Sequence, residues 1–562
     1  MILDSRSLDD GVNLTAAVII IGGGAAGITM ALELEAKNID TIVLESGGRT
    51  PDDATRDLYR GESTEIPYRF ADGCRSRFLG GSSNCWGGWC RPLDDWDFEK
   101  RDWIAHSGWP IDANDLGPYY PRTHRILELG PFNYDIGEFE KAIGKADVRR
   151  MPLPTGRVWD SISQFSPPTR LGKRFGAELE RATNVRTYLY ANVIDIEISA
   201  DARNVRRLHC RTLSGRTFTA TGRLYVLATG GIENARLLLA SNKGCAKGVG
   251  NQYDLVGRYF MEHPRIYSGS LQFRGAWHRN KLFDFKYHYQ NNAVAAFGTR
   301  IAAALSLSRE IQEREHVTNA RVWFCSIFPG DNSESSKALI RIKRRLEDRE
   351  PPETTLAGDV MTLVSHPFNT LGFIIARLYK LRALVRDVTF HAIVEPEPDP
   401  DARVTLSADH KDALGLPRVR VGWKLSQMVR RTFDRNFAII GDELRQAGVA
   451  EVTLGPKLEG GTTWPDTLDP EGTWHHMGTT RMHDSPRHGV VDRNCKVHGM
   501  DNLFIAGSSV FPTAGSNFPT QTIVALSIRL SEHIAEKLKT RDLPPAAAMV
   551  CGSAPASGGA RW

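Results

Sequence analysis

Residues 16–47 constrain the fold of this chain more than any other stretch. Four β-branched apolar residues at 18–21 form a predicted strand that runs into a glycine-rich turn, and residues 28–35 are predicted to be a helix. A second apolar run at 41–44 then ends on Glu45. Strand, turn, helix and strand in this order predict a βαβ unit, so we expect an α/β domain with a ligand site at the turn.

The turn carries glycines where a dinucleotide site requires them. Gly22 allows a sharp turn off the strand, and Gly24 lets a pyrophosphate approach the backbone. Gly27 lets the helix pack close to the strand, and the helix N-terminus offers N–H groups to the phosphates. Glu45 lies 23 positions after Gly22, near the place expected for an acid that binds ribose hydroxyls. The pattern predicts a dinucleotide but does not choose FAD over NAD.

Length and charge exclude some classes of protein. A chain of 562 residues is long enough for two or more domains. The net charge of +5 is small for this length and no recognition motif is present, so we expect no nucleic-acid partner. We expect residues 1–15 to be a loose leader without an apolar signal core, and no apolar run approaches the roughly 18 residues of a membrane span. Eight scattered cysteines without a C-x-x-C pair favour a cytoplasmic location, while secretion with a partner protein stays open.

Several later segments have readable patterns. Residues 77–89 mix glycines with tryptophans, which predicts a loop lying against something flat and bulky. Residues 223–234 repeat the strand-to-glycine turn and predict a second visit to the same sheet, and residues 266–330 favour an antiparallel sheet. A basic run occupies 341–345, and 373–386 is predicted to be a basic amphipathic helix. That helix could be a solvated face with its apolar side in the core, or could dock to an acidic partner or a membrane surface.

The chemically richest stretch lies near the C-terminus. His475 and His476 precede a glycine turn, and a strand ending at Ala506 is followed by a loop with Asn517 and a helix over 523–537. A metal site is the alternative for the histidines of this stretch. Their spacing matches no helical i, i+4 pair and no zinc finger, so we expect no metal.

These motifs together resemble the glucose-methanol-choline (GMC) oxidoreductase family. The resemblance rests on the βαβ unit, the Gly80–Gly81 loop, the turn at 228–230, residues 257–264 and the ending described above. It covers nearly the whole chain and is closer to the pyranose oxidase and sugar dehydrogenase branch than to aryl-alcohol or glucose oxidases. It implies FAD as the cofactor.

The resemblance also implies an α/β fold with an α+β second domain. A discontinuous Rossmann-like FAD domain would take residues 14–100, 185–265 and 475–540, and an antiparallel-sheet substrate domain would take 101–184 and 266–474. Residues 541–562 are expected to be a disordered tail. The fingerprint and the resemblance together assign cofactor contacts to Gly22, Gly24, Ala26, Gly27, Glu45, Gly80, Gly81, Asn84, Cys85, Val193, Thr229, Gly230, Gly507, Ser508, Pro519 and Thr520.

By resemblance, His475 is the catalytic base and His476 points elsewhere. Oxidation of a carbinol removes the O–H proton with the hydride, and a neutral imidazole can accept that proton. The ending departs from the family pattern, because Phe518 holds the place where Asn usually precedes Pro-Thr. Either the loop shifts and Asn517 is the second catalytic group, or Asn517 is structural. Cys85 stands where some relatives attach flavin to a histidine, so we expect noncovalent FAD.

The predicted function is oxidation of an alcohol group, on a sugar, glycoside or polyol, with electrons passed to O2 or another acceptor. A small-molecule carbohydrate is the expected partner, and a homo-oligomer or a redox partner is compatible with the sequence. A hydroxynitrile lyase of the same fold, which holds FAD without redox chemistry, is the main alternative. A NAD-dependent dehydrogenase is a weaker one, because the glycine fingerprint alone allows it.

Overall fold

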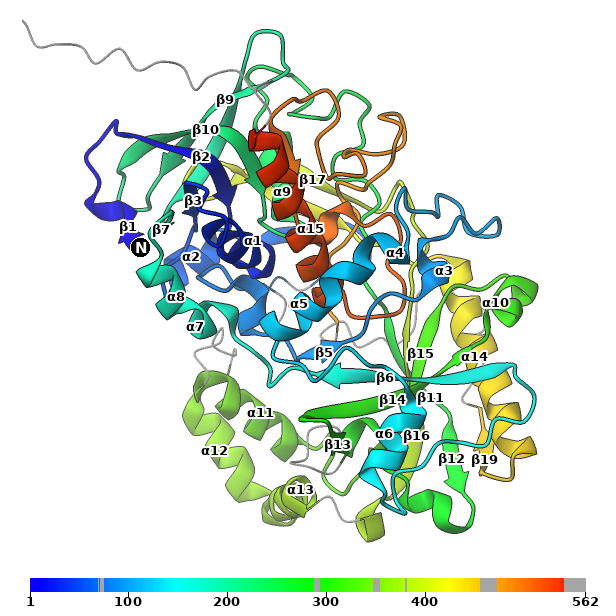
Figure 1. Ribbon diagram of the computed structural model, residues 1–562. Helices are drawn as coiled ribbons and strands as arrows, with labels where there is room; N and C mark the ends of the chain where they lie inside the picture. The colour runs from blue at the N-terminus through cyan, green and yellow to red at the C-terminus, as the bar shows by residue number, and fades with distance from the viewer. Residues whose placement is uncertain are drawn as a thin grey trace, which may run out of the picture.

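The computed structural model describes residues 1–68, 70, 75–287, 294–346, 354–379, 382–454 and 473–539. Two main sheets organise this part of the chain (Figure 1). One is largely parallel and holds the βαβ unit, and the other is largely antiparallel. The predicted mixed α/β fold class is therefore confirmed.

The first sheet has the strand order β1-β7-β3-β2-β10-β9-β8, with β20 also paired to β10. Strands β1, β7, β3, β2, β10 and β20 run parallel, while β9 and β8 are antiparallel additions. The strands are β1 Ile2–Asp4, β2 Asn13–Ile21, β3 Thr41–Leu44, β7 Val185–Leu189, β8 Asn192–Ile198, β9 Val205–Arg211, β10 Thr217–Leu227 and β20 Leu503–Ile505. Because β10 lies between β2 and β20 and all three are parallel, their C-terminal ends lie at the same edge of the sheet. This brings together segments that are nearly 500 residues apart in the chain.

Helices α1 (Ala25–Glu35) and α15 (Thr520–Lys539) pack against each other in this half of the molecule (Figure 1). Close packing of α1 on β2 depends on Gly27. A Cβ atom at this position would lie 1.9 Å from the carbonyl oxygen of Gly22. The role predicted for Gly27 in strand–helix packing therefore has a direct steric basis.

The second sheet has the order β11-β16-β15-β14-β6-β5, and β13 pairs with β14. Helix α14 (Gln427–Gln446) buries Phe433 and Phe437 in the apolar core beside it. The strands are β5 Trp89–Cys90, β6 Val158–Phe165, β11 Arg265–Ser268, β13 Ala295–Ala296, β14 Thr299–Leu307, β15 Ala320–Ile327 and β16 Asp387–Val394. Two smaller sheets pair β12 Ser270–Phe273 with β19 Ala450–Thr453, and β17 Arg403–Lys411 with β18 Pro417–Gly422 and β4 Gly61–Ser63.

The remaining α-helices are mostly short and lie in the connections. They are α2 Asp53–Asp57, α3 Asp95–Phe98, α4 Ala113–Leu116, α5 Tyr120–Ile126, α6 Ile136–Ile143, α7 Leu171–Arg174, α8 Gly176–Arg181, α9 Glu233–Ala240, α10 Arg309–Glu315, α11 Glu334–Leu346, α12 Leu356–Ser365 and α13 Pro367–Tyr379. Within the described ranges, no helix is both long and apolar enough to cross a membrane.

Three expectations differ from the structure. Residues 1–15 are not a loose leader, because β1 pairs with β7 and the N-terminal ammonium donates hydrogen bonds to the carbonyls of Leu179, Ala182 and Val185. The helix predicted over 373–386 ends at Tyr379. The glycine loop is interrupted by a 3-10 turn, η2 (Gly81–Asn84).

The predicted domain boundaries remain a prediction, and some elements lie across them. Strand β5 joins the antiparallel sheet although it precedes residue 100. Strand β18 pairs with β4, and helix α5 packs on α15, so parts of the predicted substrate segments lie against the cofactor half. The tail at 541–562 lies outside the described residues.

Candidate active site

A cavity of about 650 Å³ lies where the two halves of the chain meet. The first half contributes the ends of β2, β3 and β10, and the second contributes Arg265 and Phe285. Of the residues predicted for the site, the cavity wall includes Gly22, Gly24, Ala26, Glu45, Gly81, Cys85, Val193, Thr229, Gly230, His475, Gly507, Ser508, Pro519 and Thr520. Four predicted residues are not part of the wall: Gly27, Gly80, Asn84 and Asn517.

One end of the cavity has the features of a nucleotide site. The N-cap of α1 is Gly24, which has no side chain to cap the first turn, so the orphan backbone N–H groups of a helix N-terminus are left for an anion. Gly230 and Gly507 have left-handed φ angles of 91° and 107°, and a Cβ atom on either would meet no atom within 4 Å. The backbone is therefore open to a ligand at both positions.

Glu45 sits at the floor of this end. Its carboxylate accepts hydrogen bonds from the backbone N–H of Gly23 at 2.7 Å and of Gly47 at 3.0 Å. Burial raises the pKa of the carboxyl, and these two donors oppose the rise. The turn that would bind the phosphates also holds this carboxylate, which can accept a hydrogen bond from a ribose hydroxyl. The residues present therefore fit a dinucleotide.

Two of the four predicted residues outside the wall, Gly80 and Asn84, make contacts that hold the glycine loop. The Gly80 N–H donates to the Gly23 carbonyl at 2.8 Å, and Gly80 itself has a left-handed φ of 104°. The Asn84 side chain donates to the carbonyl of Leu79 at 3.1 Å. These positions shape the site without lining it.

His475 borders the other end of the cavity and has a fixed orientation. Its backbone N–H donates to Glu262 at 2.8 Å, and its Nδ1 lies 2.9 Å from Nδ1 of His263. Nε2 of His263 lies 2.7 Å from the carbonyl oxygen of Gly515. The segment between α9 and β11, which carries Glu262 and His263, therefore meets two segments near the C-terminus at this imidazole.

These contacts determine which nitrogen of His475 carries hydrogen. A carbonyl can only accept, so His263 donates from Nε2 to Gly515. Burial lowers the pKa of His263 to about 4, so its Nδ1 is an acceptor near neutral pH. His475 must then donate from Nδ1, which leaves its Nε2 as an unprotonated acceptor. Among the described residues, none forms a hydrogen bond with His475 Nε2.

His475 is also kept neutral. Burial is the main cause that lowers its pKa well below the usual value, and the neighbouring His263, Arg265 and His476 add to the effect. Its ring lies edge-on to Phe518, with ring centres 5.1 Å apart. The result is a neutral imidazole in an aromatic environment, with one lone pair free.

His476 also lines the cavity but has its own set of partners. Its buried ring hydrogen-bonds the hydroxyl of Tyr68, and burial lowers its pKa to about 3. Glu262 lies on the same side and accepts hydrogen bonds from Thr473 and from the backbone of His475. Burial raises the pKa of Glu262 to about 7 despite these donors.

The structure does not bring Asn517 to the cavity, contrary to the prediction that it reaches the site. Asn517 is only 2% exposed, accepts a hydrogen bond from Arg321 at 3.1 Å and donates one to the carbonyl of Pro92 at 2.8 Å. Phe518 lines the cavity instead. Both ends of the Asn517 amide are engaged in holding the loop, so this residue has a structural position.

An aromatic wall covers the cavity near His475. Trp89 and Phe285 are stacked with ring centres 5.5 Å apart, and Phe518 lies 5.2 Å from Trp89. Arg265 also lines the cavity, and within the described part of the chain its guanidinium forms no hydrogen bond or ion pair. The sequence patterns indicated none of Arg265, Phe285 or Phe518 as a binding residue, because long-range contacts bring the strand, the 3-10 turn and the C-terminal loop that carry them to one cavity.

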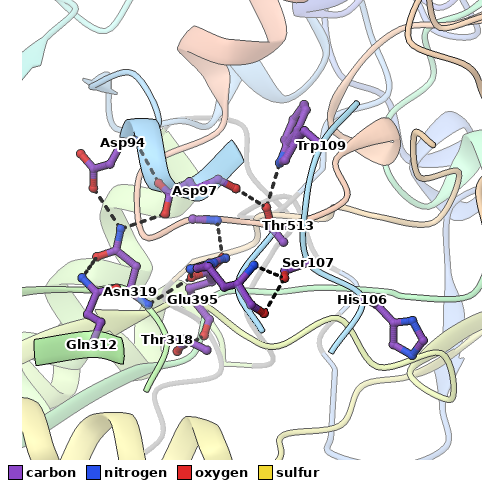
Figure 2. Close-up of polar contacts among 12 residues, drawn as sticks. Asp94, Asp97, His106, Ser107, Trp109, Gln312, Thr318, Asn319, Glu395 and Thr513 are labelled. Atoms are coloured by element: carbon purple, nitrogen blue, oxygen red, sulfur yellow. Dashed lines mark hydrogen bonds and ion pairs between the residues drawn. The ribbon is translucent and has the colours of Figure 1, made fainter. Parts of the chain in front are cut away.

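A buried polar network supports the segment that carries Gly515. Figure 2 shows Glu395, Asn319 and Asp97 within it. Arg101 forms a bidentate pair with Glu395 at 2.6 and 2.7 Å, and Glu395 also accepts the Gly515 N–H at 3.2 Å. Asn319 donates to Asp97 at 3.0 Å. The Gly515 peptide is thus fixed on both sides, by Glu395 and by His263.

The same network ties the loop before α4 to the C-terminal segment. Trp109 donates to the Thr513 hydroxyl at 2.8 Å, and Thr513 donates to the Asp97 carbonyl at 2.8 Å (Figure 2). Burial, with the neighbouring Asp94 and Glu395 carboxylates, raises the pKa of Asp97 to about 8. A Cβ atom on Gly515 would lie 2.6 Å from the Asp97 carboxylate, so this turn requires glycine.

Comparison with known proteins gives consistent results. A sequence model of the GMC oxidoreductase family matches residues 398–527, which include His475 and the start of α15. The fructose dehydrogenase large subunit of Gluconobacter japonicus is 22% identical over 94% of this chain and 99% of its own length. The 2-methyl-1,2-propanediol dehydrogenase of Mycolicibacterium austroafricanum is 23% identical over 92% of this chain and 95% of its own length. The paromamine 6'-oxidase of Streptomyces fradiae is 23% identical over 93% of this chain and 91% of its own length.

The lowered pKa of His476 predicts a pH-dependent stability. The unfolded chain binds a proton near pH 6.5 and the folded chain only near pH 3, so the contribution of His476 is present above pH 6.5 and is lost as the pH falls. His476→Gln keeps an acceptor for Tyr68 but removes this titration. Between pH 7 and pH 5 the wild type should lose about 2 kcal/mol more unfolding free energy than His476→Gln. Denaturant unfolding at both pH values measures this; parallel losses would contradict it.

Proposed function

Because the chain belongs to the glucose-methanol-choline (GMC) oxidoreductase family, we propose that it oxidises a CH–OH group of a sugar, glycoside or polyol, with FAD as the hydride acceptor and His475 as the base. The observation that carries this proposal is the hydrogen-bond chain from Gly515 through His263 to His475. It leaves an unprotonated Nε2 beside the cavity. Such a nitrogen can take the hydroxyl proton while hydride leaves the carbinol carbon.

The residues of the cavity support FAD as the bound group. The glycine turn and the N-terminus of α1 would hold the pyrophosphate, and Glu45 would bind ribose. When bound, FAD supplies a two-electron acceptor. Thr520, the first residue of α15, and Pro519 before it also line the cavity. The N-terminus of this helix would stabilise negative charge on the bound flavin.

We propose that FAD is bound noncovalently, because Cys85 replaces the histidine used for attachment in some relatives. Cys85 lines the cavity, and its thiol donates to the carbonyl of Ser82 at 3.3 Å. Acid precipitation of the holoenzyme checks this proposal. The yellow colour should stay in the supernatant, and a yellow pellet would show a covalent link.

A carbohydrate substrate suits the reaction end of the cavity. The rings of Trp89, Phe285 and Phe518 line the cavity and offer apolar surface for the C–H groups of a sugar, and Arg265 offers donors for its oxygens. The relatives named above are enzymes of fructose, paromamine and 2-methyl-1,2-propanediol, all of which carry hydroxyl groups. The aromatic wall would also exclude water from the reacting C–H bond.

Asn517 is placed away from the cavity, so His475 is the only predicted catalytic residue that borders it. Positioning of the substrate oxygen would then depend on His475 and Arg265. Arg265 is a fixed cation, and it also helps to keep His475 unprotonated. The base should therefore remain active as the pH falls below 6.5.

Replacing His475 tests the proposed base. His475→Ala should reduce the rate of flavin reduction by roughly 10²–10⁴-fold, because the hydroxyl proton loses its acceptor, while flavin binding survives. Anaerobic mixing with a panel of sugars and polyols, followed by the bleaching of the visible flavin band, measures this rate. His488→Ala, at an exposed histidine outside the cavity, is the matched control.

The same experiment separates the alternatives. If no carbinol bleaches the wild-type flavin and the protein cleaves cyanohydrins, the lyase alternative is correct. Reduction of added NAD by a flavin-free protein would support the nicotinamide alternative. A His475→Ala variant as fast as the wild type would mean that another group takes the proton.

His263 is proposed to act as a positioning residue, which sets the tautomer of His475. His263→Ala removes the acceptor for His475 Nδ1–H and should slow flavin reduction by roughly 10-fold or more. His263→Asn offers an amide oxygen near the same place and should recover much of this loss. Stopped-flow reduction across pH 5–8 gives the readout, because loss of the fixed tautomer should also move the acid limb of the rate. Equal rates and equal acid limbs in both variants would argue for packing alone.

A further inference from the structure

The helices α11, α12 and α13 carry an unusual concentration of exposed apolar side chains. Of the 17 exposed large hydrophobic residues in the described part of the chain, 11 lie between residues 340 and 379. Figure 1 shows the three helices grouped at one edge of the molecule. Isolated exposed apolar residues are normal, but a cluster on adjacent helices marks an interaction surface.

The exposed residues follow helical spacing and form one surface. On α12 they are Leu356, Val360, Met361 and Val364. On α13 they are Phe368, Leu371, Ile374, Leu378 and Tyr379. Positions three or four residues apart lie on the same side of a helix, and most of these residues follow that spacing, so each helix presents one apolar face outward. We call these nine residues the apolar face. Phe368 is its most exposed member, at 89%.

The other sides of the helices are packed against the rest of the protein, so the exposure of this face does not result from loose packing. Ala376 belongs to a small buried cluster with Tyr287 and Phe328, and Phe373 is also buried. Asp359 on α12 is buried and pairs with Arg341 on α11 at 2.6 Å. Helices α11, α12 and α13 therefore pack through their inner sides, and the apolar face consists of side chains that this packing leaves exposed.

Among the residues that the structure describes, the charge on and next to the three helices is positive. Lys337, Lys343 and Arg386 are exposed on or next to the three helices. Among the described acids of 334–386, Glu334 is exposed and forms an ion pair with Lys337 at 2.8 Å, whereas the Asp359 carboxylate is buried between Arg341 and Arg345. An apolar face with a cationic border complements a surface that is apolar inside and anionic at its edge.

We propose that the apolar face of α12 and α13 binds the surface of a bilayer that contains anionic phospholipid, with the helices lying in the interface. Lys337, Lys343 and Arg386 would contact the headgroups, and Phe368, with the leucines around it, would enter the acyl boundary. A second copy of the chain fits less well, since a two-fold contact would bring these cations opposite the same cations of the partner. This surface lies apart from the cavity and is independent of the proposed reaction.

Vesicle flotation of the full holoenzyme tests the proposal. Wild-type protein should float with vesicles of phosphatidylcholine and phosphatidylglycerol at 3:1, and roughly tenfold less with phosphatidylcholine alone or with 0.5 M salt. Phe368→Asp should lower binding about tenfold or more, because it removes an inserted ring and adds a repelled charge. Leu213→Asp, at an exposed leucine of the β9–β10 hairpin, is the matched control and should bind as the wild type does.

Each other outcome would overturn the proposal. Wild-type protein that stays unbound with the 3:1 vesicles would do so, as would equal binding by Phe368→Asp. Light scattering that shows a dimer broken by Phe368→Asp, without vesicle binding, would assign the face to a second copy. An unchanged flavin spectrum in Phe368→Asp shows that any loss of binding is not caused by unfolding.

Discussion

The hydrogen-bond chain from the Gly515 carbonyl through His263 to His475 is the interaction on which the site depends. Its direction follows from one fact, that a carbonyl only accepts, and from the neutrality of two buried imidazoles. It ends in a lone pair at the cavity. Without the hydrogen bond to Gly515, the tautomer of His475 would be free to change. His475 could then present an N–H to the substrate hydroxyl, and it could not accept the hydroxyl proton.

That chain is only as rigid as the peptide at Gly515. Glu395 holds the N–H of this peptide, and the Arg101–Glu395 pair is almost completely buried. Removing either partner of such a pair would leave an uncompensated charge, which costs about 3–5 kcal/mol. This buried ion pair therefore lies behind the segment that orients His475, while a second cluster, Glu233 with Arg75, Arg77 and Arg236, lines the cavity itself. Around the cavity itself, burial favours neutral forms of His263, His475 and His476, so hydrogen-bond direction, rather than charge, controls where protons lie.

Helices α11–α13 differ from the site in which side chains they bury and which they expose. Behind His475, polar groups are buried and hydrogen-bonded, whereas on α12 and α13 apolar groups are exposed, with exposed cations on or next to the three helices. The two regions are linked through the 3-10 turn Phe285–Tyr287, since Tyr287 packs against Ala376 of α13 and Phe285 lines the cavity. Among the described residues, the cavity wall includes none from α11–α13, so the apolar face can meet a surface without involving the cavity wall.

The sequence by itself determined the local units: the βαβ fold of residues 16–47, the second glycine turn, the final helix and the position of His475 before its turn. These depend on contacts between near neighbours, such as Gly27 against Gly22, so the chain order reveals them. Only the tertiary structure decided which side chains meet at the cavity. Asn517 was expected at the site, but Arg321 and Pro92, 196 and 425 positions away, hold its amide and turn Phe518 inward. His263 likewise gains its role from a residue 252 positions distant. A one-residue register in a loop and the tautomer of a histidine are set by such long-range partners, and spacing along a chain carries no information about them.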